Sequence, residues 1–398
     1  MNRDRDLTIL LTLKDRTAYT LRWMAYAEQI KLPFKVLIAD GGADENIARI
    51  LADRSRYPGV DYEYIRFPYD ASYTQYYAKI AAALDRVTTA YVVMADNDDF
   101  FFADALRSCV DFLAAHPGYV ACGGQCAIFW LDPPPSAGDE DRGYGRGVQW
   151  KYPGRVQSIE DDSAGERVLT RAASTVDSFY YDVKRTGEAK RQFGAVCELD
   201  LADLFLVEHL VCYLTAIAGK TRHLPLLYLA RQHNSPERSG SAHQDVFGDW
   251  MGRMLLETWS EDFAKFLDAV ASRVSAADRI PVPQARELVI RSYRMLVAPA
   301  LLSDLLDEPT VGAATPSIAA TVRRLVRLPV DSVFRRLCRW LYRRIRWISQ
   351  DVALGTGFLA QPAPDAEMQF RPVRDFLIRR PQVMSIREDA RSDLQRDA

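Results

Sequence analysis

The first hundred residues alternate between short apolar runs and segments with helical periodicity, and this alternation leaves the chain few possible folds. Apolar runs cover Leu7 to Leu13 and Phe34 to Ala39, and each is followed by a segment with the spacing of an amphipathic helix. A more polar run covers Tyr62 to Phe67, and a wholly apolar one covers Tyr91 to Ala95. Strands that alternate with helices form a mostly parallel sheet with helices on its faces. The sequence therefore predicts a Rossmann-like α/β domain.

The last part of the chain has a different pattern, because the segments beyond Gln244 are helical almost throughout and are interrupted at prolines. We therefore expect two regions, an α/β domain over residues 1–243 and an all-α region over residues 244–398. Within the first region, the pattern predicts a strand or strand pair over residues 119–131 and a helix over residues 201–218.

An acidic cluster, Asp96, Asn97, Asp98 and Asp99, directly follows the apolar run that ends at Ala95. Ligands of open α/β sheets collect at the carboxyl ends of the strands. Carboxylates this close repel one another unless a cation or a bound hydroxyl compensates them. Mn²⁺ or Mg²⁺ binds carboxylates and substrate phosphates together, so the cluster predicts a divalent-metal site that holds a diphosphate. The alternative is a solvated turn in which Asp99 caps the next helix.

Polar residues also follow the first two predicted strands. Thr12, Asp15 and Arg16 come after the first strand, where backbone and side chains can hold a nucleoside. Asp40 ends the second strand before two glycines, where its carboxylate can accept a hydrogen bond from a nucleobase N–H. Both groups have an alternative interpretation as ordinary strand-to-helix turns.

The order of these segments resembles the family 2 glycosyltransferases with a GT-A fold, over about residues 7 to 235. The resemblance is carried by Leu7–Thr12 with Lys14-Asp15-Arg16, by Leu37-Ile38-Ala39-Asp40-Gly41, and by Met94-Ala95-Asp96-Asn97-Asp98-Asp99. It implies a nucleotide-sugar donor, with a UDP-sugar favoured. It also implies that Asp96 and Asp98 bind the metal and the donor diphosphate, and that Asp40 contacts the base.

The resemblance further implies a catalytic acid on the helix that ends at Ala218-Gly219, and this acid falls on Glu208. The usual Glu-Asp pair of the family is replaced here by Glu208-His209, which leaves Asp203 and Asp200 as competing candidates. An exposed acid on an amphipathic helix is the structural alternative for Glu208.

The family carries an Arg-x-His ending after the next strand, matched here by Arg231-Gln232-His233. We expect Arg231 to clamp the donor phosphates and His233 to be a third metal ligand, although a single histidine more often has a structural role. Trp130 and Trp150 flank a long loop and are the expected acceptor contacts, because sugars stack on aromatic faces.

These residues together predict a metal-dependent glycosyltransferase that acts by inverting single displacement, as the family implies. The reaction needs a base for the acceptor hydroxyl and positive charge on the leaving diphosphate. The expected acceptor is a saccharide or a lipid-linked glycan in bacterial surface glycan synthesis. A sugar-1-phosphate nucleotidyltransferase is one alternative, disfavoured because residues 12–19 contain no glycine for a phosphate loop. A non-catalytic glycan-binding or scaffold protein with the same fold is the other.

No signal peptide and no sufficiently long apolar run is apparent, so the expected location is cytoplasmic. Residues 331–348 form a predicted helix with one apolar face and several arginines. This helix predicts either peripheral contact with the inner face of the membrane or packing on its own domain. A formal net charge of −2 argues against nucleic-acid binding, and the six cysteines lack the spacing of a zinc site.

Overall fold

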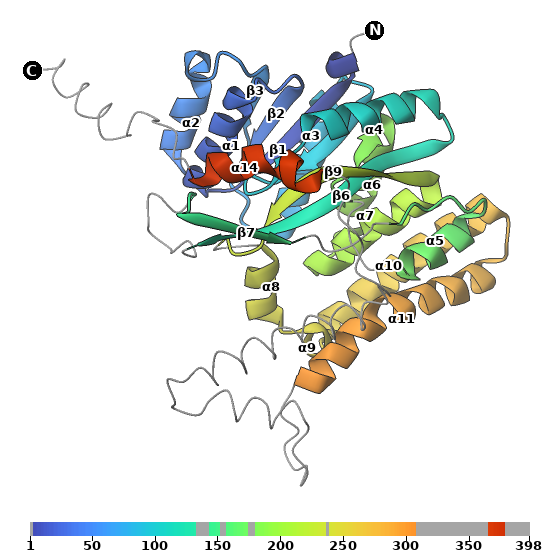
Figure 1. Cartoon of the computed structure of the whole chain (residues 1–398). Helices are drawn as coiled ribbons and strands as arrows, with labels where there is room; N and C mark the ends of the chain where they lie inside the picture. Colours follow the sequence, from blue (N-terminus) through green and yellow to red (C-terminus); the bar gives the residue numbers. More distant parts are fainter. Residues whose placement is uncertain are drawn as a thin grey trace, which may run out of the picture.

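The computed structural model describes residues 3–132, 143–151, 157–173, 180–235, 239–307 and 365–378. The described residues form a nine-stranded sheet with helices packed on both of its faces (Figure 1). The strand order is β3-β2-β1-β4-β8-β6-β9-β5, and β7 pairs with β6 outside this path. The predicted α/β fold class is confirmed.

The first half of the sheet is parallel, as the alternating pattern predicts. Its strands are β1 (Leu7–Leu13), β2 (Lys35–Asp40), β3 (Tyr62–Arg66) and β4 (Tyr91–Ala95). The helices between them are α1 (Thr17–Gln29), α2 (Glu45–Ala52) and α3 (Tyr73–Arg86), with short 3-10 helices η1 (Arg3–Asp6) and η2 (Arg54–Arg56). Leu10 of β1 is in register with Leu37 and Met94. The loops after β1, β2 and β4 consequently meet at one edge of the sheet.

Strand β1 is buried along its whole length because helices cover both faces of the sheet. Leu10 belongs to the core that contains residues of α3, α6 and α7, whereas Ile9 and Leu11 belong to the core that contains residues of α1 and α4. Each fully buried leucine or isoleucine side chain stabilises the fold by about 1.5–3 kcal/mol. Because neither face of such a strand contacts water, its sequence is one continuous apolar run.

The second half of the sheet mixes strand directions. It contains β5 (Phe100–Phe101), β6 (Tyr119–Asp132), β7 (Gly147–Lys151), β8 (Val183–Arg185) and β9 (Lys220–Gln232). Strand β8 is antiparallel to both β4 and β6, while β6 and β9 are parallel. Phe100 pairs with Ala230, so the end of β9 lies beside the residues that follow the acidic cluster.

The remaining helices cover the sheet and each other. They are α4 (Ala103–Ala115), α5 (Ala164–Ala173), α6 (Thr186–Leu199), α7 (Leu204–Ala218), α8 (Ser239–Phe247), α9 (Trp250–Met254), α10 (Glu257–Asp278), α11 (Val282–Asp307) and α14 (Ala366–Ile378). Helix α7 is apolar nearly all round and is buried under α5, α6 and α10.

The helices expected after residue 243 are present in the described residues, and they pack on the core of the α/β domain. Phe266 of α10 and Val289 of α11 belong to the same core as α6 and α7 of the α/β domain. Asp278 of α10 accepts hydrogen bonds from the backbone N–H groups of Ala164 and Gly165 at the start of α5, both at 2.7 Å. Helices α10 and α11 therefore pack as part of the α/β domain, because they cover apolar surface of α5 and α7.

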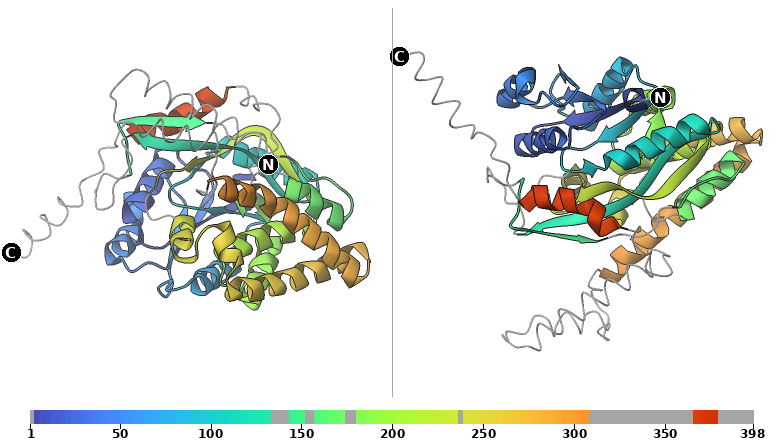
Figure 2. Two further views of the ribbon diagram at one scale, coloured as in Figure 1. Left: turned by 90° about the horizontal axis from the view of Figure 1, so that it is seen from below. Right: turned by 45° about the horizontal axis from the view of Figure 1, so that its top comes forward.

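Helix α14 also returns to the sheet. Figure 2 shows α14, in red, beside the strand pair β6 and β7. Phe370, Val373 and Phe376 of α14 pack in one cluster with Phe100 and Phe129. The basic segment 331–348 lies outside the described residues. In the part of the chain that the structure describes, no helix is long and apolar enough to cross a membrane.

Candidate functional site

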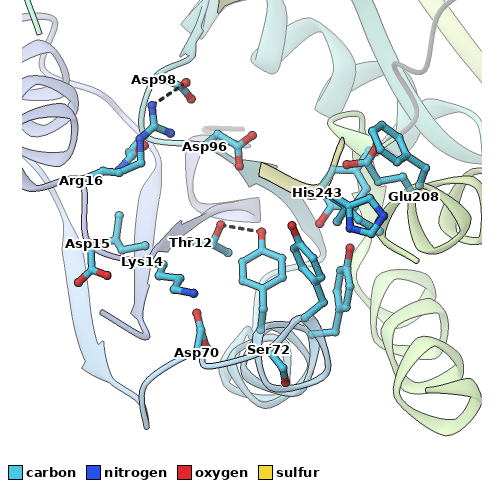
Figure 3. A pocket seen from close by; sticks show the side chains of 18 of the residues that line it. Thr12, Lys14, Asp15, Arg16, Asp70, Ser72, Asp96, Asp98, Glu208 and His243 are labelled. Carbon is cyan, nitrogen blue, oxygen red and sulfur yellow. Dashed lines mark hydrogen bonds and ion pairs between the residues drawn. The ribbon is translucent and has the colours of Figure 1, made fainter. Parts of the chain in front are cut away.

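A cavity of about 860 Å³ lies at the carboxyl ends of β1 and β4 (Figure 3). It is lined by residues from the β1–α1 turn, the start of α3, the turn after β4, helices α7 and α8, and the end of β9. The predicted site residues among these are Thr12, Asp15, Arg16, Asp96, Asp98, Glu208 and Arg231. Tertiary structure therefore brings together residues from four separate predicted segments.

Three carboxylates lie at the centre of this cavity. Ligand oxygens of Asp96, Asp98 and Asp99 lie within 4.8 Å of one another, and this is the only such acidic, histidine or cysteine group among the described residues. The Tyr181 hydroxyl donates to Asp96 Oδ2 at 2.6 Å, and Arg231 Nε donates to Asp99 Oδ2 at 2.9 Å. Clustered carboxylate oxygens are the ligand set that Mg²⁺ and Mn²⁺ prefer, so these residues fit a divalent metal.

The three aspartates differ in their ionisation. Burial would raise the pKa of Asp98, but Arg16 and Ser235 outweigh that effect and hold the pKa below its ordinary value. Burial and the neighbouring charge of Asp98 raise the pKa of Asp96. Burial raises the pKa of Asp99 to about 7 despite Arg231. Asp98 is therefore the carboxylate that is most firmly anionic at neutral pH.

The β1–α1 turn directs Arg16 at this cluster. Asp15 and Arg16 both adopt left-handed backbone conformations, with φ of 55° and 56°. Such residues cost about 1–2 kcal/mol each relative to right-handed backbone. The Asp15 carboxylate accepts a hydrogen bond from Ala43 N at 2.8 Å, and Arg16 Nη2 donates to Asp98 Oδ2 at 3.0 Å. The strained turn thus brings a cation to the most acidic aspartate.

Asp40 is buried beneath the cavity and does not line it. Its carboxylate accepts hydrogen bonds from Gly42 N at 2.8 Å and from the Tyr64 hydroxyl at 2.7 Å. Its contact with a nucleobase therefore stays a prediction. The lining residue on this side is Asp70, which forms a buried ion pair with Lys79 and whose Oδ1 has no hydrogen-bond partner.

Glu208 is the one of the three candidate bases that lines the described cavity. Asp203 instead caps α7 and accepts from Leu206 N at 3.0 Å, with His243 Nε2 at 3.2 Å from its other oxygen. Asp200 ends α6 and accepts a hydrogen bond from the Thr74 hydroxyl at 2.7 Å. These contacts favour Glu208 over Asp203, and which acid acts as the base stays a prediction.

The surroundings of Glu208 are aromatic. Tyr73, Tyr77 and Tyr181 line the same cavity, and burial followed by the charge of Glu208 raises the pKa of Tyr73 and of Tyr77. Tyr181 is partly buried, and its ring also lies under the Arg231 guanidinium, 4.5 Å from the centroid. The structure therefore places one carboxylate among uncharged phenols.

Besides Asp40 and Asp203, three further predicted site residues lie outside the cavity. The His233 ring contacts Trp130 with centroids 5.2 Å apart, so His233 is not brought to the aspartates as a third ligand. Trp150 stacks on Phe370 of α14 at 4.7 Å, and its Nε1 donates to Glu367. Neither Trp130 nor Trp150 lines this cavity, and their role as acceptor contacts stays a prediction.

Sequence reasoning missed Arg22, Lys79 and the tyrosines that α3 contributes to the cavity. Arg22 is 1% exposed and binds the backbone carbonyl of Asp98. Lys79 is 4% exposed on α3 and donates to the carbonyl of Leu13 at 2.7 Å. A lysine on the apolar face of a helix indicates a buried, paired charge, so the burial of Lys79 could have been predicted from the sequence. The sequence around Arg22 gives no comparable indication.

Residues 22–155 match the family described as Glycosyl transferase family 2. No curated protein matches the chain. The chain resembles the crystal structure of S. aureus TarS with a TM-score of 0.46 and 10% identity, covering 77% of this chain and 46% of TarS, so it spans less than half of that longer chain.

Two ligand-bound structures are also similar. S. aureus TarS 1-349 in complex with UDP-GlcNAc has a TM-score of 0.45 and 11% identity, covering 77% of this chain and 76% of that one. The mannosyltransferase PcManGT from Pyrobaculum calidifontis, in complex with GDP-Man and Mn²⁺, has a TM-score of 0.42 and 14% identity, covering 88% of this chain and 86% of that one.

Proposed function

We propose, from the match of residues 22–155 to Glycosyl transferase family 2, that this chain transfers a sugar from a nucleotide-sugar donor to a hydroxyl group of a saccharide or lipid-linked acceptor. A UDP-sugar is the favoured donor. The observation that carries the proposal is the juxtaposition, in one cavity, of three clustered aspartates with a separate carboxylate, Glu208. Figure 3 shows Asp96 between Arg16 on one side and Glu208 on the other.

The aspartate side of the cavity is suited to the diphosphate. Asp96 and Asp98 would hold Mn²⁺ or Mg²⁺, with Asp99 adjacent. When bound, the metal would neutralise charge on the leaving diphosphate. Arg231 is fixed by Asp99 and Tyr181, and Lys14 lines the same cavity, so fixed protein cations also face this region. Preorganised positive charge of this kind favours departure of the nucleoside diphosphate.

Glu208 would act as the general base. Its carboxylate takes the proton of the acceptor hydroxyl while that oxygen attacks the anomeric carbon, and the bond from that carbon to the diphosphate oxygen breaks. The products are the glycoside and the nucleoside diphosphate, with inverted anomeric configuration. The position of Glu208 opposite Arg16 across Asp96 supports attack from the side away from the leaving group (Figure 3).

Calorimetry with a panel of UDP- and GDP-sugars, with and without Mn²⁺, tests the proposal. We expect wild type and Glu208→Gln to bind one donor in the presence of metal, and only wild type to transfer its sugar. Asp98→Ala should lose metal-dependent binding, whereas Asp104→Ala, with a 97% exposed side chain on α4, should retain it. Failure of every donor to bind would overturn the proposed function, and metal-independent binding by both wild type and Asp98→Ala would overturn the metal role.

A further inference from the structure

Beyond Asp96, the cavity continues to a wall formed by α7 and α8. Leu204, Phe205 and Glu208 line it from α7, and His243, Val246 and Phe247 line it from α8. Tyr73, at the start of α3, lies opposite this wall. Figure 3 shows Glu208 and His243 together at this end of the cavity, away from Asp15 and Arg16.

This wall is aromatic, and no lysine or arginine of α7 or α8 lines it. The guanidinium of Arg253 in α9 packs on the Phe205 ring, 4.1 Å from its centroid, but does not line the cavity. The centroid of the His243 ring lies 4.5 Å from the ring centroid of Phe247. It lies 5.5 Å from the ring centroids of both Tyr73 and Phe205. Val246 is 74% exposed at its edge. The lysine and arginine residues in the described lining come from the β1–α1 turn and β9, and none comes from α7 or α8.

These properties match an uncharged sugar ring. A pyranose offers a C–H face that stacks on aromatic rings and hydroxyl groups that donate to a carboxylate. A phosphate or carboxylate on the same ring would find Glu208 and no lysine or arginine from α7 or α8, which disfavours an anionic acceptor.

Asp203 connects the elements that build this wall. Its carboxylate caps α7 through Leu206 N and lies 3.2 Å from both His243 Nε2 of α8 and Arg253 Nη1 of α9. The backbone N–H of Asp203 itself donates to Asp262 of α10 at 3.0 Å. One buried carboxylate therefore holds α8 against α7, and the side chain of His243 is fully enclosed between them.

We propose that the α7–α8 wall is the acceptor subsite, that it binds an uncharged sugar ring, and that Asp203 is a positioning residue for this wall. The proposal rests on the proposed function, because Glu208 can serve as base only for an acceptor bound here. It replaces Trp130 and Trp150 as acceptor contacts and assigns Asp203 a role in acceptor affinity, separate from proton transfer.

Saturation-transfer NMR on the full chain, loaded with diamagnetic Mg²⁺ and the nucleotide identified by calorimetry, tests the subsite. The probes are p-nitrophenyl glycosides of glucose, galactose, mannose and N-acetylglucosamine, compared with p-nitrophenyl glucuronide and p-nitrophenyl phosphate. We expect at least one neutral glycoside to bind and the two anionic probes not to bind. Exclusive binding of an anionic probe, or binding of no neutral glycoside, overturns the proposal.

Phe247→Ala should weaken binding of that glycoside about fivefold to tenfold, because one stacking face is lost, and leave donor affinity unchanged. Leu255→Ala is the matched control, since Leu255 is 82% exposed and does not line the cavity. Unchanged glycoside affinity in Phe247→Ala overturns the subsite. Because Phe247 is not in the buried core, this variant decides the question even if variants of Asp203 do not fold.

Asp203→Asn keeps a side-chain oxygen that can cap α7 but weakens the contacts to His243 and Arg253. We expect a higher KM for the acceptor with kcat and donor affinity little changed, whereas Glu208→Gln should lose kcat. Loss of kcat at constant acceptor KM in Asp203→Asn would instead identify Asp203 as the base. If no donor binds to the wild type, the proposed function is refuted. If donors bind normally but the Phe247 and Asp203 variants leave acceptor binding and acceptor KM unchanged, only the present inference is refuted.

Discussion

Arg22 Nη2, buried in helix α1, donates a hydrogen bond to the backbone carbonyl of Asp98 at 3.2 Å. Its Nη1 donates to Gln232 Oε1 at 2.8 Å and to the carbonyl of Gly143 at 2.7 Å. Burial lowers the pKa of Arg22 to about 10, so the guanidinium stays charged at neutral pH. One buried cation thus connects the turn that carries Asp96, Asp98 and Asp99 to the end of β9.

Arg22→Lys should keep the positive charge but lose most of these contacts, because one ammonium group cannot reproduce the planar fork of a guanidinium. We expect Mn²⁺-dependent donor affinity to fall about tenfold, the effect typical of residues that support metal ligands. Calorimetry measures this, with Arg107→Lys on the surface of α4 as the control. Equal donor affinities in the two variants would show that Arg22 has only a structural role.

Mn²⁺ should stabilise the folded protein, since a ligand that binds only the folded state at a hundred times its Kd adds about 2.7 kcal/mol. Thermal melting after chelator treatment, with and without added Mn²⁺, measures the effect. Asp98→Asn should abolish the rise in Tm, and Asp104→Asn should preserve it. An equal rise in Asp98→Asn would place the metal elsewhere.

The buried pair of Asp70 and Lys79 should show strong coupling. Their side chains are 1% and 2% exposed, so Asp70→Asn leaves Lys79 without its counter-charge and should cost about 3–5 kcal/mol of unfolding free energy. Asp70→Asn combined with Lys79→Met should recover part of that loss. Urea denaturation of the two single variants and the double variant gives the coupling energy. Additive effects would contradict an interaction between the two charges.

Lys184 should make stability depend on pH. It is 2% exposed in β8, and burial lowers its pKa to about 8. A lysine whose folded pKa lies below its unfolded value of about 10.4 penalises folding at pH 7, and this penalty declines as pH rises from about 8 to 10.4. The difference in unfolding free energy between wild type and Lys184→Met should therefore move in favour of wild type from pH 7 to pH 9.5.

Urea denaturation at both pH values measures this difference, and the comparison with Lys184→Met cancels the buried tyrosines and cysteines that titrate in the same range. Lys184→Arg is a useful second variant, because an arginine stays charged across this range and should retain the penalty at both pH values. A difference between wild type and Lys184→Met that does not change with pH would mean that Lys184 has an ordinary pKa in the folded protein.

Many residues on the aspartate side of the cavity could be predicted from the sequence, because they directly follow buried strands. An apolar run such as Leu7–Leu13 can satisfy its burial only between two helical layers, and this places Asp15 and Arg16 at the strand end. The same reasoning placed Asp96 and Asp98 together. Local periodicity and the parallel-sheet rule were sufficient for these positions.

The rest depended on contacts between segments far apart in the chain. Asp203 and Glu208 lie five positions apart on one helical segment, and only the packing of α8 and α9 shows that the first is enclosed by His243 and Arg253 while the second lines the cavity. Likewise, only the docking of α14 shows that Trp150 is covered by Phe370.

The sequence by itself determined the α/β architecture and the aspartate cluster, because both follow from hydrophobic periodicity within single segments. Tertiary structure alone decided which polar side chains line the cavity, because that depends on which faces of α7, α8 and β9 are covered by other elements. Burial of a side chain is a property of its neighbours in space, and these neighbours can come from segments more than 200 positions away, as in the contact of Arg22 with Gln232, which are 210 positions apart.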